Sequence, residues 1–449
     1  MPTRAIVAPT PVEPAGAIPA PTYFIAADVG QVVRIEPDGR TLTQVTFEPI
    51  TVVEFDVAAT GALVFSTGEL TANQRTLVAL DGSGRRELLT GAISAPRVAP
   101  DGQRVVFRLD DPPPGLIIGQ ESTPPGVWSA PLTGGRPSLV IADVPVDDVY
   151  DAANPAWSYY PVAFSPDGSR LALYAFDRDG PGVPGGELVL LGPGPEQVVR
   201  GFSCCEEERW NEDGSALHMG GGGPGPDVRY GLYRIDAATG AESAVIEAAP
   251  DGPVPLVRAP RQFDDGAIYA FVELAPAASF SWEYPFRPTL TRVAPDGSMT
   301  PLSPPLAAPS EVLWRDNPLG ALLTTSDSAR PDGIGAGQLA WQAADGSPLR
   351  LIAASGLNLR WVPEDGALWD GDCAAFSPLR YEEAAARQFN PATRDLQGRL
   401  NNLLLGAGEP DGFYGEQTRA AVTAFQQERA LPVSGDVDCA TWQALLGRP

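Results

Sequence analysis

Alternating apolar and polar residues on both sides of Asp-Gly turns recur through residues 23–371. This pattern predicts β-hairpins, because alternate side chains of a strand face one buried side and Asp-Gly favours a tight turn. The first hairpin of the repeat is seen in RVAPDGQRVVFRL from Arg97, VAFSPDGSRLALYAF from Val162, RWNEDGSALHM from Arg209 and RQFDDGAIYAFV from Arg261. A second pair of strands follows, as in LYRIDAATGAESAVI from Leu232.

The spacing of these units predicts a mainly β fold, a β-propeller of four-stranded blades. First strands fall near Val52, Ala95, Val162, Glu206, Val257, Glu311 and Asn358, roughly 43 to 67 residues apart, the size of a blade with insertions. We expect about seven blades, with six or eight as alternatives. Tyr23 begins on a second strand, whereas Asn358 to Gly366 supplies a late first strand. The N- and C-terminal strands are therefore expected to close one blade, which removes free sheet edges.

Helical spacing replaces strand alternation between Leu396 and Leu446. We expect a small all-α domain of three helices at residues 391–449, with Asp438 as the N-cap of the third. A linker with a short helix, Leu379 to Gln388, is expected at 372–390. The expected buried faces are Leu396, Leu400, Leu403 and Leu404, then Thr418, Ala421, Val422 and Phe425, then Cys439, Trp442, Leu445 and Leu446.

The order of residues in this C-terminal part carries a resemblance. The relevant positions are Leu396-Gln397, Asp411-Gly412-Phe413-Tyr414-Gly415, Thr418, Ala421-Val422, Phe425-Gln426, Leu431, Gly435 and Thr441-Trp442. They resemble the three-helix peptidoglycan-binding module of bacterial cell-wall proteins. The sequence departs from that pattern at Ala430-Leu431, where Gly-Leu is more usual, and in a longer approach to the Asp-Gly turn. The resemblance implies recognition of peptidoglycan.

Polar or half-exposed groups beside the turn are the candidates for ligand contact. A polymer of sugar and peptide would be held by hydrogen bonds and an aromatic face, so we expect Tyr414 to be the principal contact. The apolar residues of the module are expected to be core, with Gly412 and Gly415 serving the turn. The complete set of expected contacts is Asp411, Phe413, Tyr414, Gln417, Arg419 and Gln426.

The β-rich part resembles the TolB-like, WD-type propeller repeats of bacterial periplasmic proteins, through turns such as Phe164-Ser165-Pro166-Asp167-Gly168. This repeat specifies no ligand. Longer insertions at residues 110–126, 143–160 and 220–227 are expected on the surface, where loops often carry function. The second insertion contains Asp147, Asp148 and Asp151, which form either a solvated loop or a site for a partner or calcium.

Charge and composition narrow the classes of partner. The 449 residues carry a formal net charge of -25, which argues against nucleic acid and anionic membrane surfaces as partners. No apolar run is long enough for a membrane span. Residues 1–22 are rich in Pro and Ala without a signal-peptide core, and we expect a disordered spacer. We therefore expect an extracytoplasmic protein, in the periplasm, in the cell wall or secreted, whose upstream signal or lipid anchor is missing from this chain.

The chain contains four cysteines. Cys373 precedes the helical domain and Cys439 opens its last helix, so we expect a disulfide that contributes about 4 kcal/mol by the loop-entropy estimate. For Cys204 and Cys205 a vicinal disulfide and buried thiols both stay open. No CxxC spacing or pair of histidines accompanies them, so no metal site is expected.

A single histidine, His218, restricts catalysis. Zinc hydrolases need more histidine ligands than this, and His218 falls on a predicted strand where simple packing is expected. We expect a non-catalytic envelope protein without cofactors, whose helical module binds peptidoglycan and whose propeller binds a protein or small ligand. The alternative is a glycosidase-type cell-wall hydrolase targeted by the module, because 56 acidic residues leave a catalytic carboxylate pair open.

Overall fold

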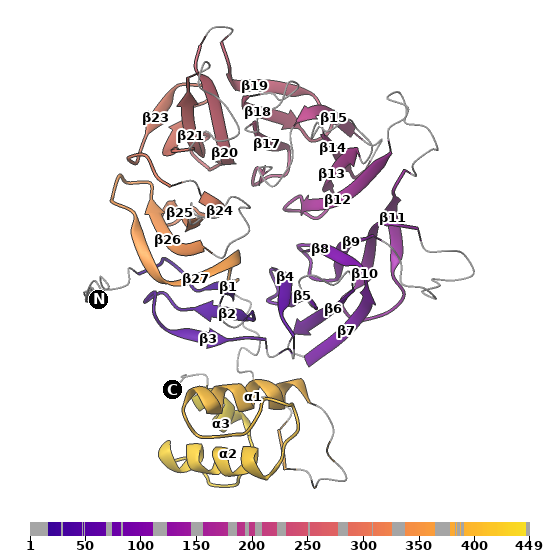
Figure 1. The fold of residues 1–449 in the computed structure, drawn as a ribbon, viewed down its shortest axis with the longest axis vertical. Coiled ribbons are helices and arrows are strands. Elements are labelled where there is room, and N and C mark those ends of the chain that lie inside the picture. Colours follow the sequence, from indigo (N-terminus) through magenta and orange to yellow (C-terminus); the bar gives the residue numbers. More distant parts are fainter. Residues whose placement is uncertain are drawn as a thin grey trace, which may run out of the picture.

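The computed structural model describes residues 17–27, 30–46, 48, 50–68, 74–81, 84–110, 124–144, 156–177, 186–193, 197–202, 209–221, 230–249, 252–276, 286–307, 309–325, 337–363, 378–381, 383, 387 and 390–445. These residues form mainly β-structure in small antiparallel sheets, followed by three helices. Figure 1 shows the sheets arranged around a common centre, with the helices at one side. The predicted combination of a mainly β part and a three-helix C-terminal part is confirmed.

Five four-stranded sheets follow one another along the described part of the chain. The first contains β4 (Val52–Val57), β5 (Leu63–Thr67), β6 (Arg75–Asp81) and β7 (Gly84–Gly91). The second contains β8 (Ile93–Val98), β9 (Arg104–Leu109), β10 (Gly126–Pro131) and β11 (Ser138–Ala142). The third contains β12 (Trp157–Phe164), β13 (Leu171–Asp177), β14 (Gly186–Leu191) and β15 (Gln197–Phe202).

The fourth and fifth sheets repeat this order of strands. The fourth contains β16 (Arg209–Trp210), β17 (Ala216–Gly221), β18 (Gly231–Asp236) and β19 (Glu242–Glu247). The fifth contains β20 (Val254–Gln262), β21 (Ile268–Ala275), β22 (Thr289–Val293) and β23 (Met299–Pro301). In every sheet consecutive strands are paired, as expected for chains of hairpins.

The two ends of the β-rich part meet in one seven-stranded sheet. Its strands are β24 (Pro309–Arg315), β25 (Gly320–Thr325), β26 (Gly337–Ala343), β27 (Arg350–Trp361), β1 (Thr22–Ala26), β2 (Val32–Ile35) and β3 (Leu42–Gln44). The first half of β27 pairs with β26, and its second half pairs with β1, where Tyr23 lies opposite Arg360. β27 is therefore the last strand of the group β24–β27 and also the first strand of the group formed with β1, β2 and β3. The predicted pairing of the late strand near Asn358 with the N-terminal strands is confirmed.

Local turn chemistry explains the hairpins. Gly102 and Gly168 have φ angles of 66° and 70°, a left-handed backbone that glycine adopts without strain. The preceding Asp101 and Asp167 each accept a hydrogen bond from a backbone N–H two residues ahead, at 2.9 and 3.0 Å. These side chains fix the conformation of the turn. The geometry of each hairpin is therefore determined by about a dozen neighbouring residues.

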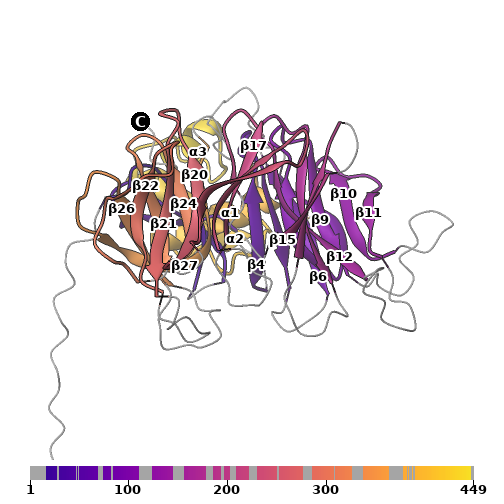
Figure 2. The same ribbon diagram turned by 90° about the horizontal axis from the view of Figure 1, so that it is seen from above.

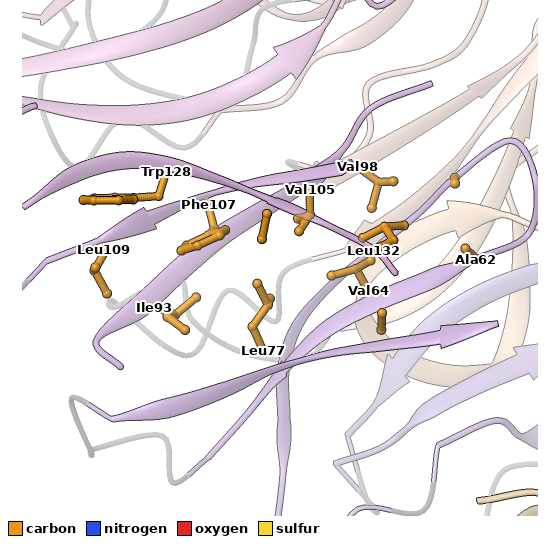
Figure 3. Close-up of a cluster of buried hydrophobic side chains, with 13 residues drawn as sticks. Ala62, Val64, Leu77, Ile93, Val98, Val105, Phe107, Leu109, Trp128 and Leu132 are labelled. Atoms are coloured by element: carbon orange, nitrogen blue, oxygen red, sulfur yellow. The ribbon is translucent and has the colours of Figure 1, made fainter. Parts of the chain in front are cut away.

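Neighbouring sheets pack face to face through apolar side chains. In Figure 3, Val64 and Leu77 of the first sheet face Ile93, Phe107 and Trp128 of the second, and each is at most 5% exposed. Similar clusters join the second sheet to the third, the third to the fourth, the fourth to the fifth and the fifth to β24 and β25. A further cluster joins β1 and β2 to β4 and β5. Seen edge-on in Figure 2, successive sheets stand side by side.

The C-terminal module contains α1 (Pro391–Asn402), α2 (Glu416–Glu428) and α3 (Cys439–Leu445). Its core includes Leu396, Phe425 and Trp442, each at most 1% exposed, so the three predicted apolar faces meet as expected. One part of the prediction is wrong. Leu403 and Leu404 are 42% and 92% exposed, because α1 ends at Asn402 and the chain turns through a positive φ at Leu404.

Asp438 caps α3 as predicted, since its Oδ1 accepts a hydrogen bond from the N–H of Thr441 at 2.8 Å. The expected helix at Leu379 to Gln388 is wrong at its start. Leu379 forms a β-bridge with Val437, because its side chain is needed in the helical core. Farther along, the N–H of Arg387 donates to the carbonyl of Glu383, as in one helical turn.

The expected spacer at residues 1–22 is also too long. Ile18 is 3% exposed and packs in the cluster that holds β1 and β26, and its N–H donates to the carbonyl of Pro37. Thr22 already belongs to β1. The apolar side chain of Ile18 therefore anchors the last residues of the Pro-rich segment to the sheet, whereas residues 1–16 lie outside the described part.

The helical module rests against the β-rich part near β3 and β7 (Figure 1). Arg394 of α1 approaches the carboxylate of Glu48 at 3.7 Å, and Arg85 of β7 binds the same carboxylate through two hydrogen bonds of 2.8 and 2.9 Å. The Glu48 side chain is only 3% exposed, so both arginines compensate for the burial of its charge.

Candidate functional site

Two buried glutamines hold the loops of the helical module in place. The side-chain amide of Gln426 donates to Ser434, Asp436 and Thr441, and its carbonyl oxygen accepts from the N–H groups of Ser434 and Gly435. Gln426 is 0% exposed, so its side chain depends on these bonds, and those to Thr441 and Gly435 are fully buried.

Gln397 makes the same arrangement one helix earlier. Its amide donates to Asp411, Phe413 and Thr418, and its carbonyl oxygen accepts from the N–H of Gly412. Both glutamines thus join one helix to the loop that follows it and to a threonine on the next helix. The signal for this in the sequence is the repeated pair of an apolar residue and glutamine, Leu396-Gln397 and Phe425-Gln426.

Two of the expected ligand contacts, Tyr414 and Gln426, are buried inside the module. Tyr414 is 3% exposed, and its hydroxyl donates to the carbonyl of Gly435 at 2.9 Å. Burial raises the pKa of its phenol above the usual value. Tyr414 and Gln426 were expected to be half-exposed, but both are framework groups whose polar atoms bind the module itself.

The other four expected contacts lie at the surface. Asp411 and Phe413 are exposed, the latter at 38%, and the Asp411 carboxylate accepts a hydrogen bond from the N–H of Phe413. Gln417 lies against Gly408 of the preceding loop, whereas Arg419 lies beside Gly435 and stacks over Tyr381 at 5.2 Å. Asp411, Phe413 and Gln417 thus belong to the α1–α2 side of the module, and Arg419 belongs to another side.

A second candidate site is a cavity of about 850 Å³ that the first strand of every sheet lines. Several of these strands carry β-bulges that face it. Ala95, Ala259 and Asn358 occupy equivalent bulge positions with φ angles of 49°, 49° and 59°. Non-glycine residues in this conformation are strained, and bulges of this kind are over-represented next to functional sites.

Carboxylates in the cavity wall join neighbouring strands that line the cavity. Glu54 accepts a hydrogen bond from the N–H of Ala95, and Glu311 accepts bonds from the N–H groups of Asn358 and Leu359, at 2.8 to 3.0 Å. Asp56 accepts from the N–H of Val98 and from Arg360. The bulges free these N–H groups from the strand ladder, and the carboxylates satisfy them. Sequence reasoning missed these contacts because each joins two different repeats.

His218 lies on β17 with Arg209 and Arg234 directly opposite on the two adjacent strands. The imidazole is 1% exposed, so the predicted packing is confirmed. Burial, with a further contribution from the charge of Arg234, lowers the pKa of His218 to about 4. His218 is therefore neutral at pH 7.

We expect this histidine to weaken the protein in mild acid. The unfolded chain takes up a proton near pH 6.5 and the folded chain near pH 4, so stability falls as the pH drops between these values. Between pH 7 and 4.5 the loss from this group is about 2 kcal/mol. Urea unfolding of the wild type and His218→Phe at both pH values measures it. An equal loss in the two proteins excludes this role for His218.

The most buried ion pair among the described residues, Arg108 with Asp143, lies where the second sheet meets β12 of the third. Arg108 is 3% and Asp143 9% exposed, and two hydrogen bonds of 2.9 and 3.0 Å join them. Arg108 also donates to the carbonyl of Tyr159 and stacks over Tyr160 at 4.3 Å. Burial alone would lower the pKa of Arg108, but its hydrogen bonds to Asp143 and the charge of Asp110 outweigh burial and raise it.

Several expected residues lie outside the described part of the chain. These are Asp147, Asp148 and Asp151 of the long insertion, and Cys204, Cys205 and Cys373. Cys439 is described, and it is disulfide-bonded. A disulfide at the start of α3 agrees with the expected staple, whereas its pairing with Cys373 stays a prediction.

Comparison with known proteins bears first on the helical module. Residues 390–445 match the model of the peptidoglycan binding domain family. The match spans the three helices and both glutamine networks, so the resemblance read from the sequence is confirmed for this part of the chain. No curated protein matches the chain in sequence.

Solved structures resemble the β-rich part only distantly. A prolyl endopeptidase and puromycin hydrolase share 10% and 16% identity with the chain, with TM-scores of 0.48 and 0.47. They cover 74% and 77% of this chain, which spans 46% and 54% of theirs, about half their length. A TolB candidate from Agrobacterium tumefaciens shares 13% identity with a TM-score of 0.36, and covers 77% of this chain and 95% of its own. Likeness at this level gives no information about activity.

Among the described residues, no helix is both long and apolar enough to cross a membrane.

Proposed function

We propose that this protein is a non-catalytic component of the bacterial cell envelope. Its C-terminal module at residues 391–449 binds peptidoglycan, and its β-rich part at residues 23–371 binds a protein or small ligand. The family match at residues 390–445 carries the proposal. The closed apolar core and the two glutamine networks support it, because they hold the module in one defined shape.

The binding platform in this proposal is a closed propeller of seven four-stranded blades. Support comes from the pairing of β27 with both β26 and β1, which divides the seven-stranded sheet into two groups. The apolar clusters between successive sheets, including the one between β1–β2 and β4–β5, support the same arrangement. Radial repetition of this kind leaves only short strand edges at the rim, and this limits aggregation through exposed edges.

Recognition of peptidoglycan would use the exposed residues of the α1–α2 side. Phe413 offers a ring face to a sugar, and Asp411 and Gln417 offer hydrogen-bonding groups beside it. Arg419 lies on another side of the module, so it would contact the polymer only if the polymer wraps around α2. Tyr414 and Gln426 support these groups from within.

Co-sedimentation with insoluble sacculi tests the proposal. We expect the full-length protein to bind, and Phe413→Ala and Gln417→Ala to reduce the bound fraction about threefold to tenfold, because each removes a group that contacts the polymer. Gln427→Ala is the matched control, since Gln427 is an exposed glutamine on the same helix. A full-length protein that stays in the supernatant at micromolar concentration refutes peptidoglycan binding.

The same samples test the hydrolase alternative. After incubation, the supernatant is analysed for soluble sugar and peptide fragments. A non-catalytic protein releases none above the buffer control. Fragment release that increases with protein concentration would assign an enzymatic role and replace the first proposal.

A further inference from the structure

The first helix of the C-terminal module, α1, is buried on two opposite sides. Leu396 and Leu400 belong to the core of the module and are 0% exposed. Gly398 is two positions from each of them, so it lies on the opposite side of the helix, and it is buried as well. Glycine is among the weakest helix formers. Its lack of a side chain here allows a neighbouring part of the protein to lie directly against α1.

The β-rich part is this neighbour. Arg394 lies one turn before Gly398 on the same side of α1, and its guanidinium approaches the Glu48 carboxylate at 3.7 Å. The helix contacts β3 and β7, the end strands of two sheets that follow one another along the chain (Figure 1). The side of α1 that faces away from the module core is therefore a docking face for the β-rich part.

Glu48 is held in position by the β-rich part alone. The side chain of Gln31 accepts a hydrogen bond from the N–H of Glu48 at 2.9 Å and donates one to its carbonyl at 3.2 Å. Gln31 is 6% exposed and also accepts from the hydroxyl of Thr46. Arg85 fixes the carboxylate itself through its two hydrogen bonds. The acceptor that Arg394 meets is thus preorganised, which lowers the entropic cost of docking.

A second residue of α1 acts on the N-terminal strands. Tyr23 of β1 is 2% exposed, and burial raises the pKa of its phenol, whereas the charges of Arg34 and Arg399 oppose this rise. Arg399 belongs to α1, so the helix lies within electrostatic reach of β1 as well as of Glu48. Burial also lowers the pKa of Arg394, and the charge of Glu48 opposes this change.

Docking of α1 connects the C-terminal end of the β-rich part to its N-terminal end. The module follows β27 in the chain, yet α1 contacts β3, which follows β1 and β2. Within the β-rich part, the same two ends meet through the noncovalent pairing of β27 with β1. A second link between the same two ends makes their separation harder, because both links must then break.

We propose that the C-terminal module has a second role, as a latch that holds the two ends of the β-rich part together. The latch is the docking face of α1, with Arg394 and Gly398, and its partner is the surface formed by β3, β7 and the Glu48 carboxylate. A docked module also presents the α1–α2 side in one fixed direction. This inference goes beyond the proposed binding of peptidoglycan and does not depend on it.

Gly398→Gln tests the latch from the side of the module. Glutamine favours a helix more than glycine does, so the change strengthens an α1 that is not docked but pushes a docked α1 away from β3 and β7. We expect hydrogen exchange in peptides from residues 22–46 of the full-length protein to become at least about tenfold faster, although the change lies elsewhere. Ala420→Gln is the matched control, because it places the same side chain at an exposed position of α2.

Glu48→Gln tests the same contact from the side of the β-rich part. The variant removes the charge that Arg85 and Arg394 share and leaves two guanidinium groups beside a neutral acceptor. Because coupling between two parts is reciprocal, we expect exchange in peptides from residues 391–402 to become about tenfold faster. Glu87→Gln is the matched control, since Glu87 binds the same Arg85 but its side chain is 62% exposed.

The inference is overturned if residues 22–46 exchange in Gly398→Gln as they do in Ala420→Gln. It is equally overturned if Glu48→Gln changes exchange in α1 no more than Glu87→Gln. Should Gly398→Gln unfold the module itself, seen as lost protection of residues 416–428, Glu48→Gln decides alone. Sacculus binding by Glu48→Gln is expected to be unchanged. A protein that sediments with sacculi but shows no coupling between its two parts keeps the proposed function and loses only the latch.

Discussion

Replacing Asp143 by alanine will lower the free energy of unfolding by about 3 to 5 kcal/mol. Arg108 is only 3% exposed, so the variant leaves a buried guanidinium without its two-bond partner. The carboxylate also accepts bonds from the hydroxyl of Ser158 and the N–H of Tyr159, and these donors lose their acceptor as well. Urea unfolding at neutral pH measures the effect.

Asp110 provides the matched control for this prediction. It binds the same arginine, but its side chain is 46% exposed, so Asp110→Ala is expected to cost less than about 1 kcal/mol. The double variant Arg108→Met, Asp143→Leu is expected to be more stable than Asp143→Ala, since no charge stays buried. If Asp143→Ala and Asp110→Ala cost the same, the burial argument for this pair is wrong.

Replacing Gln426 by leucine will unfold or loosen the helical module. The variant removes the partners of two backbone N–H groups and one carbonyl in the loop at residues 434–436. With each of the three unsatisfied groups costing about 1 to 3 kcal/mol, we expect a loss of roughly 3 to 9 kcal/mol. Hydrogen exchange of the full-length protein, followed in peptides from residues 416–445, measures the loss.

Binding to sacculi should fall with the same variant, although Gln426 touches no ligand in our proposal. Gln427→Leu makes the same chemical change at the next, exposed position and is expected to leave both hydrogen exchange and binding intact. Normal protection of residues 434–436 in Gln426→Leu would contradict the structural role that we assign to this side chain.

Most of the fold was predictable because its information is local. The Asp-Gly turns at Gly102 and Gly168 carry their own backbone geometry and capping side chains, and strand alternation on both sides tells which residues are buried. The helical faces were equally clear, except at Leu403 and Leu404. A periodic pattern does not say where a helix ends, and here the chain leaves α1 at Asn402.

The sites were harder to predict because their partners are far apart in the chain. Arg108 and Asp143 are 35 residues apart, and Glu311 binds Asn358 across 47. No short-range pattern marks such pairs. Gln426 is different, because it lies eight positions after Thr418 and shares the buried side of α2. Helical spacing therefore contained the signal that this glutamine is internal, but polarity alone favoured a place at the surface.

The position of β27 has a consequence for synthesis of the protein. Residues 22–26 meet residues 356–361, so β1 receives its neighbour on the side of the central cavity only after more than 300 further residues have been made. Until then the nascent chain presents the edge of β1, a template for pairing with other chains. We therefore expect chains that stop before β27 to aggregate more readily than the complete chain.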